Sequence, residues 1–211
     1  MGTIYFTSDL HFSHQSILKP EYTDRGDDLR KLEAERDPDS AWPPSDLIER
    51  HNQWIIDTIN SRVTKADQLY ILGDLAFDSQ WQAASLIDRL NGHRRLIPGN
   101  HDERKLDFYA ASGLFESVTM YAEVVYNKKR IILFHYPIAE WNAGHHSSWH
   151  LHGHTHGNFD YAKANLQNKR ILDVGWDNSK KVLGYYGPFS FEQIENYMDG
   201  RESIEHHGNA D

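Results

Sequence analysis

The sequence predicts an α/β fold whose main sheet has parallel character. Three observations predict it. Short apolar runs rich in β-branched and aromatic residues recur along the chain, segments of helical spacing lie between the first three of them, and 211 residues suit one core of ordinary size. Strands that alternate with helices form parallel sheets, and sites in such folds lie at the carboxyl edge of the strands.

Four apolar runs predict strands, and each one ends at a polar residue. TIYFTSD ends at Asp9, QLYILGD at Asp74, RRLIPGNHD at Asn100 and His101, and RIILFHY at His135. A buried strand that ends in this way delivers a polar side chain to the edge of its sheet. The repetition therefore predicts a shared polar site at that edge.

Two helices are expected between the first three strands. Residues 45–62 carry an apolar stripe that includes Trp54, and residues 79–91 carry another that includes Trp81. Apolar residues at this spacing form one face of a helix that packs on a core. Both helices are therefore expected to cover the sheet.

The second half of the chain has a different pattern of predicted elements. TMYAEVVYNKKRIILFHY predicts a hairpin around Asn127 and Lys128, and RILDVGWD and KVLGYYGPFSF are interpreted as further strand pieces. A last helix is expected to begin at Ser190, because Gln193 follows three residues later as in a capping box, and to end before Gly200.

These elements predict one domain over residues 1–200. Residues 19–46, KPEYTDRGDDLRKLEAERDPDSAWPPSD, are charged and punctuated by proline. They are interpreted as an insertion packed near the site, as a solvated loop, or as a partly disordered segment. Residues 201–211 are expected to form a frayed polar tail.

Composition excludes several classes of function. With no cysteine, the chain has no disulfide, thiolate zinc site, iron–sulfur cluster or cysteine nucleophile, so any metal must be held by His, Asp, Glu, Asn or backbone oxygen. A net charge of −9 disfavours extended binding to nucleic acid. With no apolar stretch near the ~20 residues of a membrane helix, we expect a soluble cytoplasmic protein with no membrane partner.

The stretch HLHGHTH places a histidine at every second position, namely His150, His152, His154 and His156. An internal, interrupted run is a poor match to a purification tag. Ordinary polar surface is one interpretation, and metal ligation is another, because neutral imidazole is the commonest metal ligand. A metal site needs further ligands elsewhere in the chain.

Such ligands are available at the predicted strand ends, beside glycine or in turns. If each of these side chains were only a solvated surface group, we would not expect so many possible metal ligands at the ends of the predicted strands. The complete set is Asp9, His11, Asp74, Asn100, His101, His135, His154 and His156.

These residues carry a resemblance to a known family. DLH, GD, GNHD, an isolated H and GHTH follow one another over residues 9–156, and in this order they resemble the five-part signature of the calcineurin-like metallophosphoesterases. The resemblance implies a four-layer α/β/β/α sandwich, with two central sheets flanked by helices and the metals at the carboxyl edges of the strands.

The resemblance also implies a site for two divalent metal ions. Asp9, His11 and His156 would hold the first ion, Asn100, His135 and His154 the second, and Asp74 would bridge both. Two divalent ions ~3.5–4 Å apart would acidify a shared water, and the resulting hydroxide would attack the phosphate ester in line. Manganese is the first expectation, and iron, zinc and nickel also suit such ligands.

Two catalytic roles follow from the same resemblance. His101 would stabilise or protonate the leaving oxygen, and Asp102 is expected to orient its imidazole. In the protein-phosphatase branch an aspartate near the GD block pairs with that histidine, but here Phe77 stands in its place. Phosphoprotein substrates are therefore disfavoured.

Candidate substrate-binding residues lie near these motifs. His14 follows the DLH block, and Trp141 and Trp149 lie between His135 and His150. The aromatic side chains could stack a nucleobase or could equally be loop core. His152 is a candidate for a supporting hydrogen bond beneath the metal ligands, and His150 for the pocket wall, with packing the favoured alternative for both.

The function predicted from the sequence is a metal-dependent phosphoesterase for a phosphodiester or a small nucleotide-like ester. Few basic residues lie near the motifs, whereas a monoester dianion needs extra cationic groups. A phosphomonoesterase is the alternative. Two further alternatives are a catalytically inactive interaction scaffold and a metal-sensing regulator.

Overall fold

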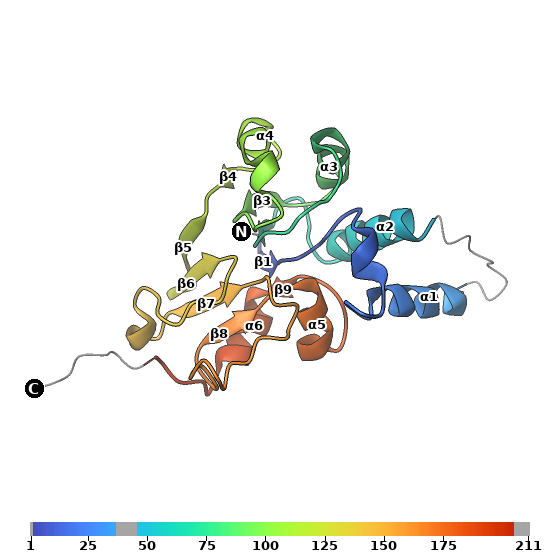
Figure 1. Ribbon diagram of the computed structural model, residues 1–211. Helices are drawn as coiled ribbons and strands as arrows, with labels where there is room; N and C mark the ends of the chain where they lie inside the picture. The colour runs from blue at the N-terminus through green and yellow to red at the C-terminus, as the bar shows by residue number, and fades with distance from the viewer. Residues whose placement is uncertain (1, 37–45, 205–211) are drawn as a thin grey trace, which may run out of the picture.

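The computed structural model describes residues 2–36 and 46–204, which fold into two β-sheets flanked by helices (Figure 1). The first sheet has the order β4-β3-β2-β1-β9. Its first four strands run parallel, and β9 pairs antiparallel with β1, which confirms the predicted parallel sheet. The strands are β1 (Ile4–Thr7), β2 (Gln68–Ile71), β3 (His93–Leu96), β4 (Ser117–Val118) and β9 (Phe189–Ser190).

The second sheet has the order β5-β6-β7-β8. Strands β5 (Tyr121–Tyr126) and β6 (Lys129–Phe134) form the predicted antiparallel hairpin. Both residues of its turn have left-handed backbone, with φ of 47° at Asn127 and 64° at Lys128, as a tight hairpin requires. Strand β6 continues in parallel with β7 (Trp149–His152) and β8 (Ile171–Asp173), so these three strands end at one edge.

The core has two layers because the first sheet is buried on both faces. Phe6 of β1 packs with Leu133 and Leu151 of the second sheet. Leu69 and Ile71 of β2 pack on the opposite side, against the helices. Neighbouring side chains along a strand point to opposite faces, so an apolar run supplies both layers at once.

Helices cover the outer face of the first sheet. They are α2 (Leu47–Asn60), α3 (Gln80–Ile87) and α4 (Leu106–Ala111), the last preceded by the short 3₁₀ helix η3 (Glu103–Lys105). The helices expected at 45–62 and 79–91 are thus confirmed as α2 and α3, with the difference that the Trp81 side chain is exposed and does not pack on the core. Over the outer face of the second sheet, loops and the short η4 (Gly144–His146) bury a third apolar cluster, so this fourth layer consists mainly of loop.

The segment after β8 corrects one prediction. KVL belongs to helix α5 (Trp176–Leu183), which ends at Gly184 in the left-handed conformation that favours glycine, with φ of 81°. Only Phe189–Ser190 of the predicted stretch is strand. Helix α6 (Phe191–Met198) then begins with the predicted capping box of Ser190 and Gln193.

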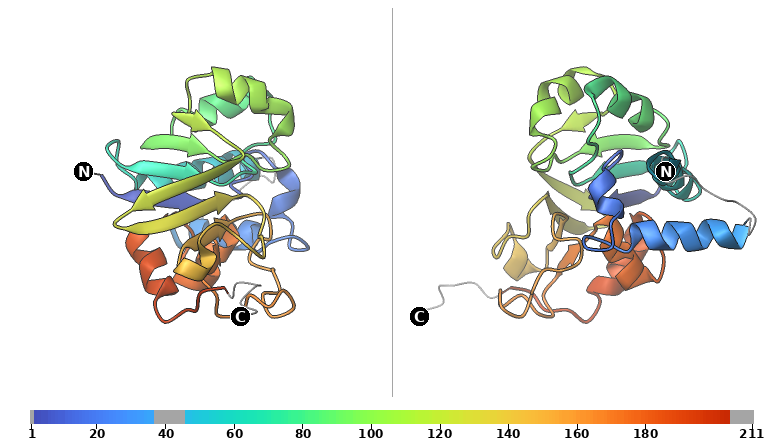
Figure 2. Two further views of the ribbon diagram at one scale, coloured as in Figure 1. Left: turned by 90° about the vertical axis from the view of Figure 1, so that its left-hand side faces the viewer. Right: turned by 45° about the vertical axis from the view of Figure 1, so that its right-hand side comes forward.

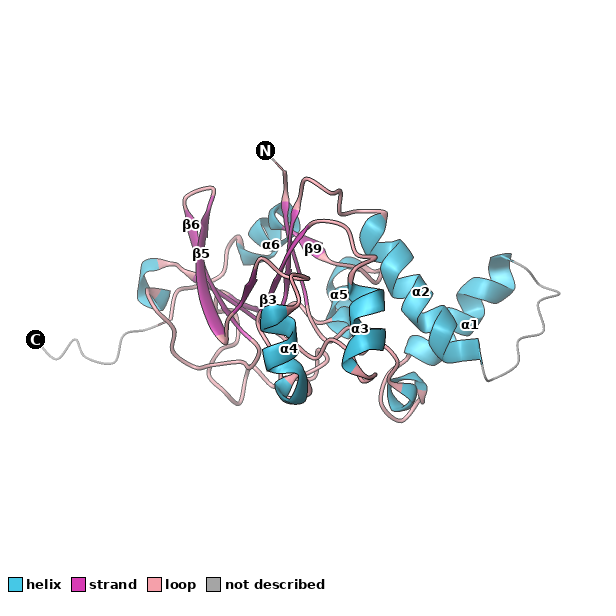
Figure 3. Cartoon of the chain, turned by 90° about the horizontal axis from the view of Figure 1, so that it is seen from above, coloured by secondary structure: helices cyan, strands magenta, loops and turns pink. Residues whose placement is uncertain are grey.

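The charged segment 19–46 contains helix α1 (Arg25–Arg36), which follows the short η1 (Gln15–Leu18). Residues 37–45 lie outside the described part of the chain. Seen from above, α1 and α2 lie on the side opposite the β5–β6 hairpin (Figure 3). The plain-loop interpretation is therefore wrong for residues 25–36.

The beginning of the predicted polar tail is ordered. Lys169 Nζ lies 3.1 Å from a carboxylate oxygen of Glu202, and backbone hydrogen bonds join the same two stretches. Ile204 packs against the cluster that contains Trp141. The expectation of fraying is wrong for residues 201–204, and residues 205–211 lie outside the described residues.

Candidate metal centre

The candidate ligands lie where strands of both sheets end. The loops after β1 and β2 run side by side, because the Asp9 N–H donates to the Gly73 carbonyl (2.9 Å) and the His11 N–H to the Asp74 carbonyl (3.0 Å). From the second sheet, the His154 N–H donates to Oδ2 of Asp9 (3.0 Å). The predicted polar edge therefore forms between the two sheets.

Two groups of three residues could each hold a metal ion, and the ligand atoms within each group lie within 4.8 Å of one another. Oδ2 of Asp74 lies 3.8 Å from Nε2 of His11 and 3.6 Å from Nε2 of His135. One carboxylate thus faces both groups. Asn100 Oδ1 lies 3.3 Å from His135 Nε2, beside the second group. The first triad is Asp9, His11 and His156, and the second triad is Asp74, His135 and His154.

Backbone conformation at these residues is costly. Five of the six triad residues have left-handed φ angles: 55° at Asp9, 52° at His11, 53° at Asp74, 70° at His154 and 50° at His156. For residues other than glycine this conformation costs on the order of 1–3 kcal/mol each and clusters at functional sites. The surrounding fold therefore holds these turns in a strained arrangement that aims their side chains together.

The residues present fit a pair of divalent cations. Nε2 of His11 is buried and finds no hydrogen-bond partner among the described residues, although it points at two carboxylates. A Cβ atom at Gly99 would lie 2.3 Å from Asp74 Oδ1, and one at Gly153 would lie 2.6 Å from Asp9 Oδ2. Only glycine admits the carboxylates at these two places. Carboxylate and imidazole donors without thiolate suit hard or borderline metals.

The charges of the buried carboxylates and imidazoles in this cluster favour the binding of cations. Burial raises the pKa of Asp74, but His135, the His101 backbone N–H and His11 outweigh it and lower the pKa to about 2. Burial lowers the pKa of His135, but Asp74 and Asp9 outweigh it and raise the pKa to about 9. Burial raises the pKa of Asp9. Bound cations would supply the positive charge that these buried carboxylates need.

Asp177 and Arg25 support the first triad from outside it, and neither was predicted from the sequence. Oδ2 of Asp177, in the first turn of α5, lies 2.6 Å from Nδ1 of His156. The buried Arg25 guanidinium donates to both carboxylate oxygens of Asp177 (2.7 Å each). Burial raises the pKa of Asp177, but Arg25 and His156 hold it well below its usual range. One signal could have found Asp177, because RILDVGWD ends in an acid as the ligand-bearing strands do.

His101 lies at the open side of the centre. Its side chain is 45% exposed, and its Nε2 lies 4.0 Å from Oδ2 of Asp74. Asp102 does not have the expected partner. Its buried carboxylate accepts the backbone N–H groups of Asp74 (2.8 Å), Leu75 (3.1 Å) and Gly99 (2.9 Å). Asp102 therefore braces the loops that carry ligands, and it does so because buried N–H groups need acceptors.

Aromatic rings replace the carboxylate expected beside His101. The Phe77 ring lies 4.7 Å from that of His101 and stacks on His14 at 3.7 Å, with 7° between the planes. Nδ1 of His14 lies 2.8 Å from Nδ1 of His11. Burial and neighbouring cations lower the pKa of His14 to about 4. The structure therefore brings His14 to the rim of the centre.

Trp141 and Trp149 are not at the rim. Trp149 is 2% exposed, lies in β7 and packs on Phe191 between the sheets. Trp141 is 7% exposed and belongs to the cluster under the outer loops. The prediction that these two residues bind substrate is wrong, because their large apolar surfaces are used in the core.

The two remaining histidines of the HLHGHTH stretch are also buried. Nε2 of His152 lies 2.8 Å from the Tyr161 hydroxyl, and Nδ1 of His150 lies 3.2 Å from the Ile132 carbonyl. Packing was the favoured alternative for both. Only His154 and His156 of this run belong to the triads.

The two-sheet fold and the paired triads indicate a candidate metal-binding protein, and comparison with known proteins identifies its family. The family model for calcineurin-like phosphoesterases matches residues 2–209, so the chain belongs to this family.

Two proteins are similar to this chain in sequence, and one solved structure is similar to it in fold. An uncharacterized protein of Methanocaldococcus jannaschii is 29% identical, covering 92% of this chain and 90% of that one. The gene 66 protein of Mycobacterium phage L5 is 28% identical, covering 74% of this chain and 78% of that one. A crystal structure of a protein of unknown function from Aquifex aeolicus aligns with a TM-score of 0.60 and 21% identity, covering 93% of this chain and 100% of that one, and it supports the fold.

The length and apolar character of the described helices bear on insertion into a membrane. None of those in residues 2–36 and 46–204 is long and apolar enough to cross a membrane.

Proposed function

We propose that this protein is a dinuclear metal-dependent phosphoesterase that acts on a phosphodiester or a small nucleotide-like ester. One observation carries the proposal: Asp74 Oδ2 lies within 4 Å of imidazole nitrogens from both triads. Two divalent ions bound there would activate a water for in-line attack on phosphorus and neutralise the phosphate oxygens.

Each residue then has a role of its own. Asp9, His11 and His156 would hold one ion and Asn100, His135 and His154 the other, with Asp74 between them. Because His101 is half exposed beside Asp74, its imidazole reaches the side from which an ester enters. It would donate a hydrogen bond or a proton to the leaving oxygen. His14 and Phe77 would contact the leaving group at the same rim.

Manganese is the first choice of metal. The candidate ligands are nitrogen and oxygen atoms only, in a chain without cysteine, and such ligands suit Mn²⁺, Fe²⁺, Ni²⁺ and Zn²⁺. The carboxylates of Asp9 and Asp74 at the centre are ligands that suit Mn²⁺.

The neighbourhood of the first triad supports a diester. A cavity of about 300 Å³ opens beside His156, between residues 20–24 and α5, and Tyr22, Tyr186, Lys180 and Asp24 are among the residues that line it. A diester needs room for a second ester arm, and this cavity offers it next to the first triad, since His156 is among its lining residues. Of the two lysines that line this cavity, Lys180 is paired with Asp24 and Asp28, and Lys181 donates to the backbone carbonyls of residues 156 and 157. Neither is left over for a monoester dianion.

Hydrolysis of bis-p-nitrophenyl phosphate and p-nitrophenyl phosphate should be measured side by side, on protein stripped with chelator and reloaded with Mn²⁺. Manganese-dependent turnover of the diester in excess of the monoester is expected. Faster turnover of the monoester would establish the phosphomonoesterase alternative. Absence of turnover with both metals bound would overturn the enzymatic proposal and leave the interaction scaffold or the metal sensor.

A further inference from the structure

The Arg25 side chain joins helix α1 to the loops of the first triad. It is fully buried, and its guanidinium makes four hydrogen bonds. Nε and Nη2 donate to the two carboxylate oxygens of Asp177 (2.7 Å each). Nη2 also donates to the Asp9 carbonyl (2.7 Å), and Nη1 donates to the Leu10 carbonyl (3.0 Å). One residue of α1 thus connects the loop after β1 with the first turn of α5.

Every acceptor of Arg25 belongs to a ligand or lies next to one. Asp9 is itself a member of the first triad, and Leu10 precedes His11. Asp177 Oδ2 lies 2.6 Å from Nδ1 of His156, which turns Nε2 of that ring toward Asp9 at 3.9 Å. A histidine that donates its other ring N–H to a carboxylate has its tautomer and orientation set for metal binding.

The shape of the guanidinium is essential to this arrangement. Its planar fork spans two carboxylate oxygens and two carbonyls at once, whereas an ammonium group is a compact point charge. A lysine at position 25 would keep the positive charge but could not reach all four acceptors. The charge and the fork can therefore be separated by mutation.

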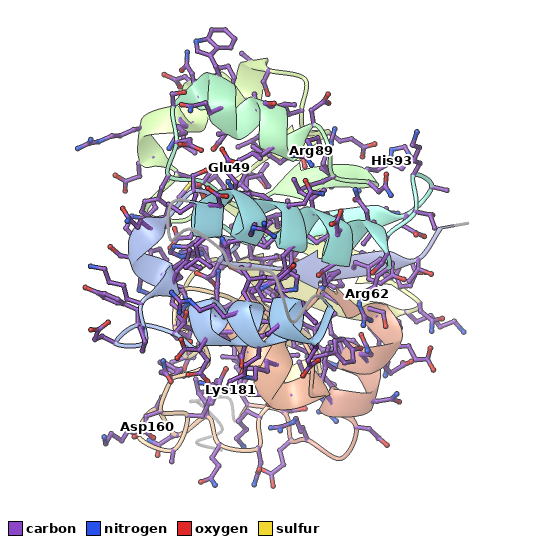
Figure 4. The ribbon with its side chains drawn as sticks, turned by 90° about the vertical axis from the view of Figure 1, so that its right-hand side faces the viewer. Glu49, Arg62, Arg89, His93, Asp160 and Lys181 are labelled. Atoms are coloured by element: carbon purple, nitrogen blue, oxygen red, sulfur yellow. The ribbon has the colours of Figure 1, made fainter. Side chains whose placement is uncertain are left out.

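A second contact between α1 and α5 provides a matched control. The carboxylate of Asp28 accepts hydrogen bonds from Lys180 Nζ and from the Tyr186 hydroxyl (2.8 Å). Asp28 follows Arg25 by three residues, and Lys180 follows Asp177 by three, so both contacts lie along one face of each helix. Figure 4 shows α1 between α2 and α5, and the right view of Figure 2 agrees.

The second triad is held by other groups. Nδ1 of His135 donates to the Leu72 carbonyl (2.6 Å), and the Asp102 carboxylate accepts the Asp74 N–H. These supports come from the residue after β2 and from the loop after β3. A defect at Arg25 would therefore act on the first triad in preference to the second.

We propose that Arg25 is a positioning residue for the first metal ion. Through Asp177 and the two carbonyls it sets the geometry of Asp9, His11 and His156. This inference rests on the proposed dinuclear function. It assigns to the charged segment 19–46 a part in building the metal centre.

The test compares Arg25→Lys with Asp28→Asn and with the unmodified protein. Mn²⁺ binding to chelator-stripped protein is measured by isothermal titration calorimetry, and thermal unfolding is followed with and without Mn²⁺. We expect two ions per unmodified chain. Arg25→Lys should weaken one of them about 10–100-fold, the loss typical of groups that orient metal ligands, and leave the other unchanged. Asp28→Asn should unfold at a lower temperature but bind both ions normally.

The thermal measurement separates positioning from simple stabilisation. A ligand that binds only the folded state raises its stability by an amount that depends on affinity. Arg25→Lys should therefore show a smaller Mn²⁺-induced rise in Tm than Asp28→Asn. Equal rises and two unchanged sites in Arg25→Lys would overturn the inference. If the unmodified protein binds no metal, the proposed function itself fails, which is a distinguishable result.

A second variant covers the case in which Arg25→Lys does not fold. Asp177→Asn keeps a carbonyl acceptor for Arg25 or His156 but removes the charge that both share. It should again weaken one Mn²⁺ site of two, because the His156 ring loses its carboxylate partner. Normal affinity at both sites in folded Asp177→Asn would contradict a connection from Arg25 to the first triad.

Discussion

Oδ2 of Asp74 lies 3.6 Å from Nε2 of His135, and the two residues come from different sheets. Asp74 follows β2 of the first sheet, and His135 follows β6 of the second. The same oxygen lies 3.8 Å from His11 Nε2 of the first triad. The candidate centre is therefore a property of how the two sheets pack, and Asp74 is its common member.

Replacing Asp74 should abolish metal occupancy. In Asp74→Asn the neutral amide cannot serve as an anionic ligand between two cations, so both sites should weaken and activity should fall with them. Metal content per chain, measured by inductively coupled plasma mass spectrometry after gel filtration, checks this. Two retained ions in a folded Asp74→Asn protein would remove Asp74 from the ligand set.

His101 should behave in the opposite way. His101→Ala is expected to keep both ions and to lose about 10²–10⁴-fold in kcat, the usual contribution of general acid–base catalysis. The reason is that its exposed imidazole lies beside the triads and belongs to neither. Metal content and kinetics are measured on the same sample. An inactive variant that has also lost its metals would make His101 a ligand.

Gly153 should be indispensable to the first triad. In Gly153→Ala the added Cβ would lie 1.9 Å from Ser8 Oγ and 2.6 Å from Asp9 Oδ2, so the Asp9 carboxylate must move. We expect Mn²⁺ affinity to fall at one site, as measured by calorimetry. Gly113→Ala is a suitable control, since it meets no atom within 4 Å although its φ is 73°. A loss of affinity as large in the control would show that general strain is responsible.

The metal-free protein should lose one contribution to stability in acid. Burial raises the pKa of Asp67, but hydrogen bonds from Thr64 and Thr3 outweigh it and hold the pKa below its usual range. A depressed folded-state pKa means that the carboxylate stabilises the fold above the unfolded pKa of about 3.9, and that this contribution disappears as pH falls through the folded value.

Asp67→Asn tests this linkage. Its amide would place N–H groups against the Thr64 N–H and hydroxyl donors, which now lie 2.7 Å from Oδ2. At pH 7 we expect a loss of about 1–3 kcal/mol in the free energy of unfolding, measured in urea on chelated protein. The difference between the two proteins should narrow below about pH 4. A difference that is independent of pH would contradict the linkage.

Most of the candidate site was visible in the sequence because it is encoded locally. The candidate ligands follow apolar runs, as Asp9 follows TIYFTS and Asp74 follows QLYILG, and parallel strands bring their carboxyl ends to one edge. The hairpin at Asn127 and the capping box at Ser190 were predictable for the same reason. Their signals lie within a few residues of one another.

The tertiary structure was needed wherever a residue acts through a distant partner. Arg25 and Asp177 are 152 positions apart, and no local pattern marks an arginine in a charged segment as buried. Asp102 was expected to orient its neighbour His101, but its carboxylate accepts hydrogen bonds from the backbone N–H groups of Asp74 and Leu75. From the sequence, Trp149 was expected to bind substrate, but its side chain packs between the two sheets. In each case the packing of segments far apart in the chain selects the partner, because burial requires every polar group to be satisfied and every apolar surface to be covered.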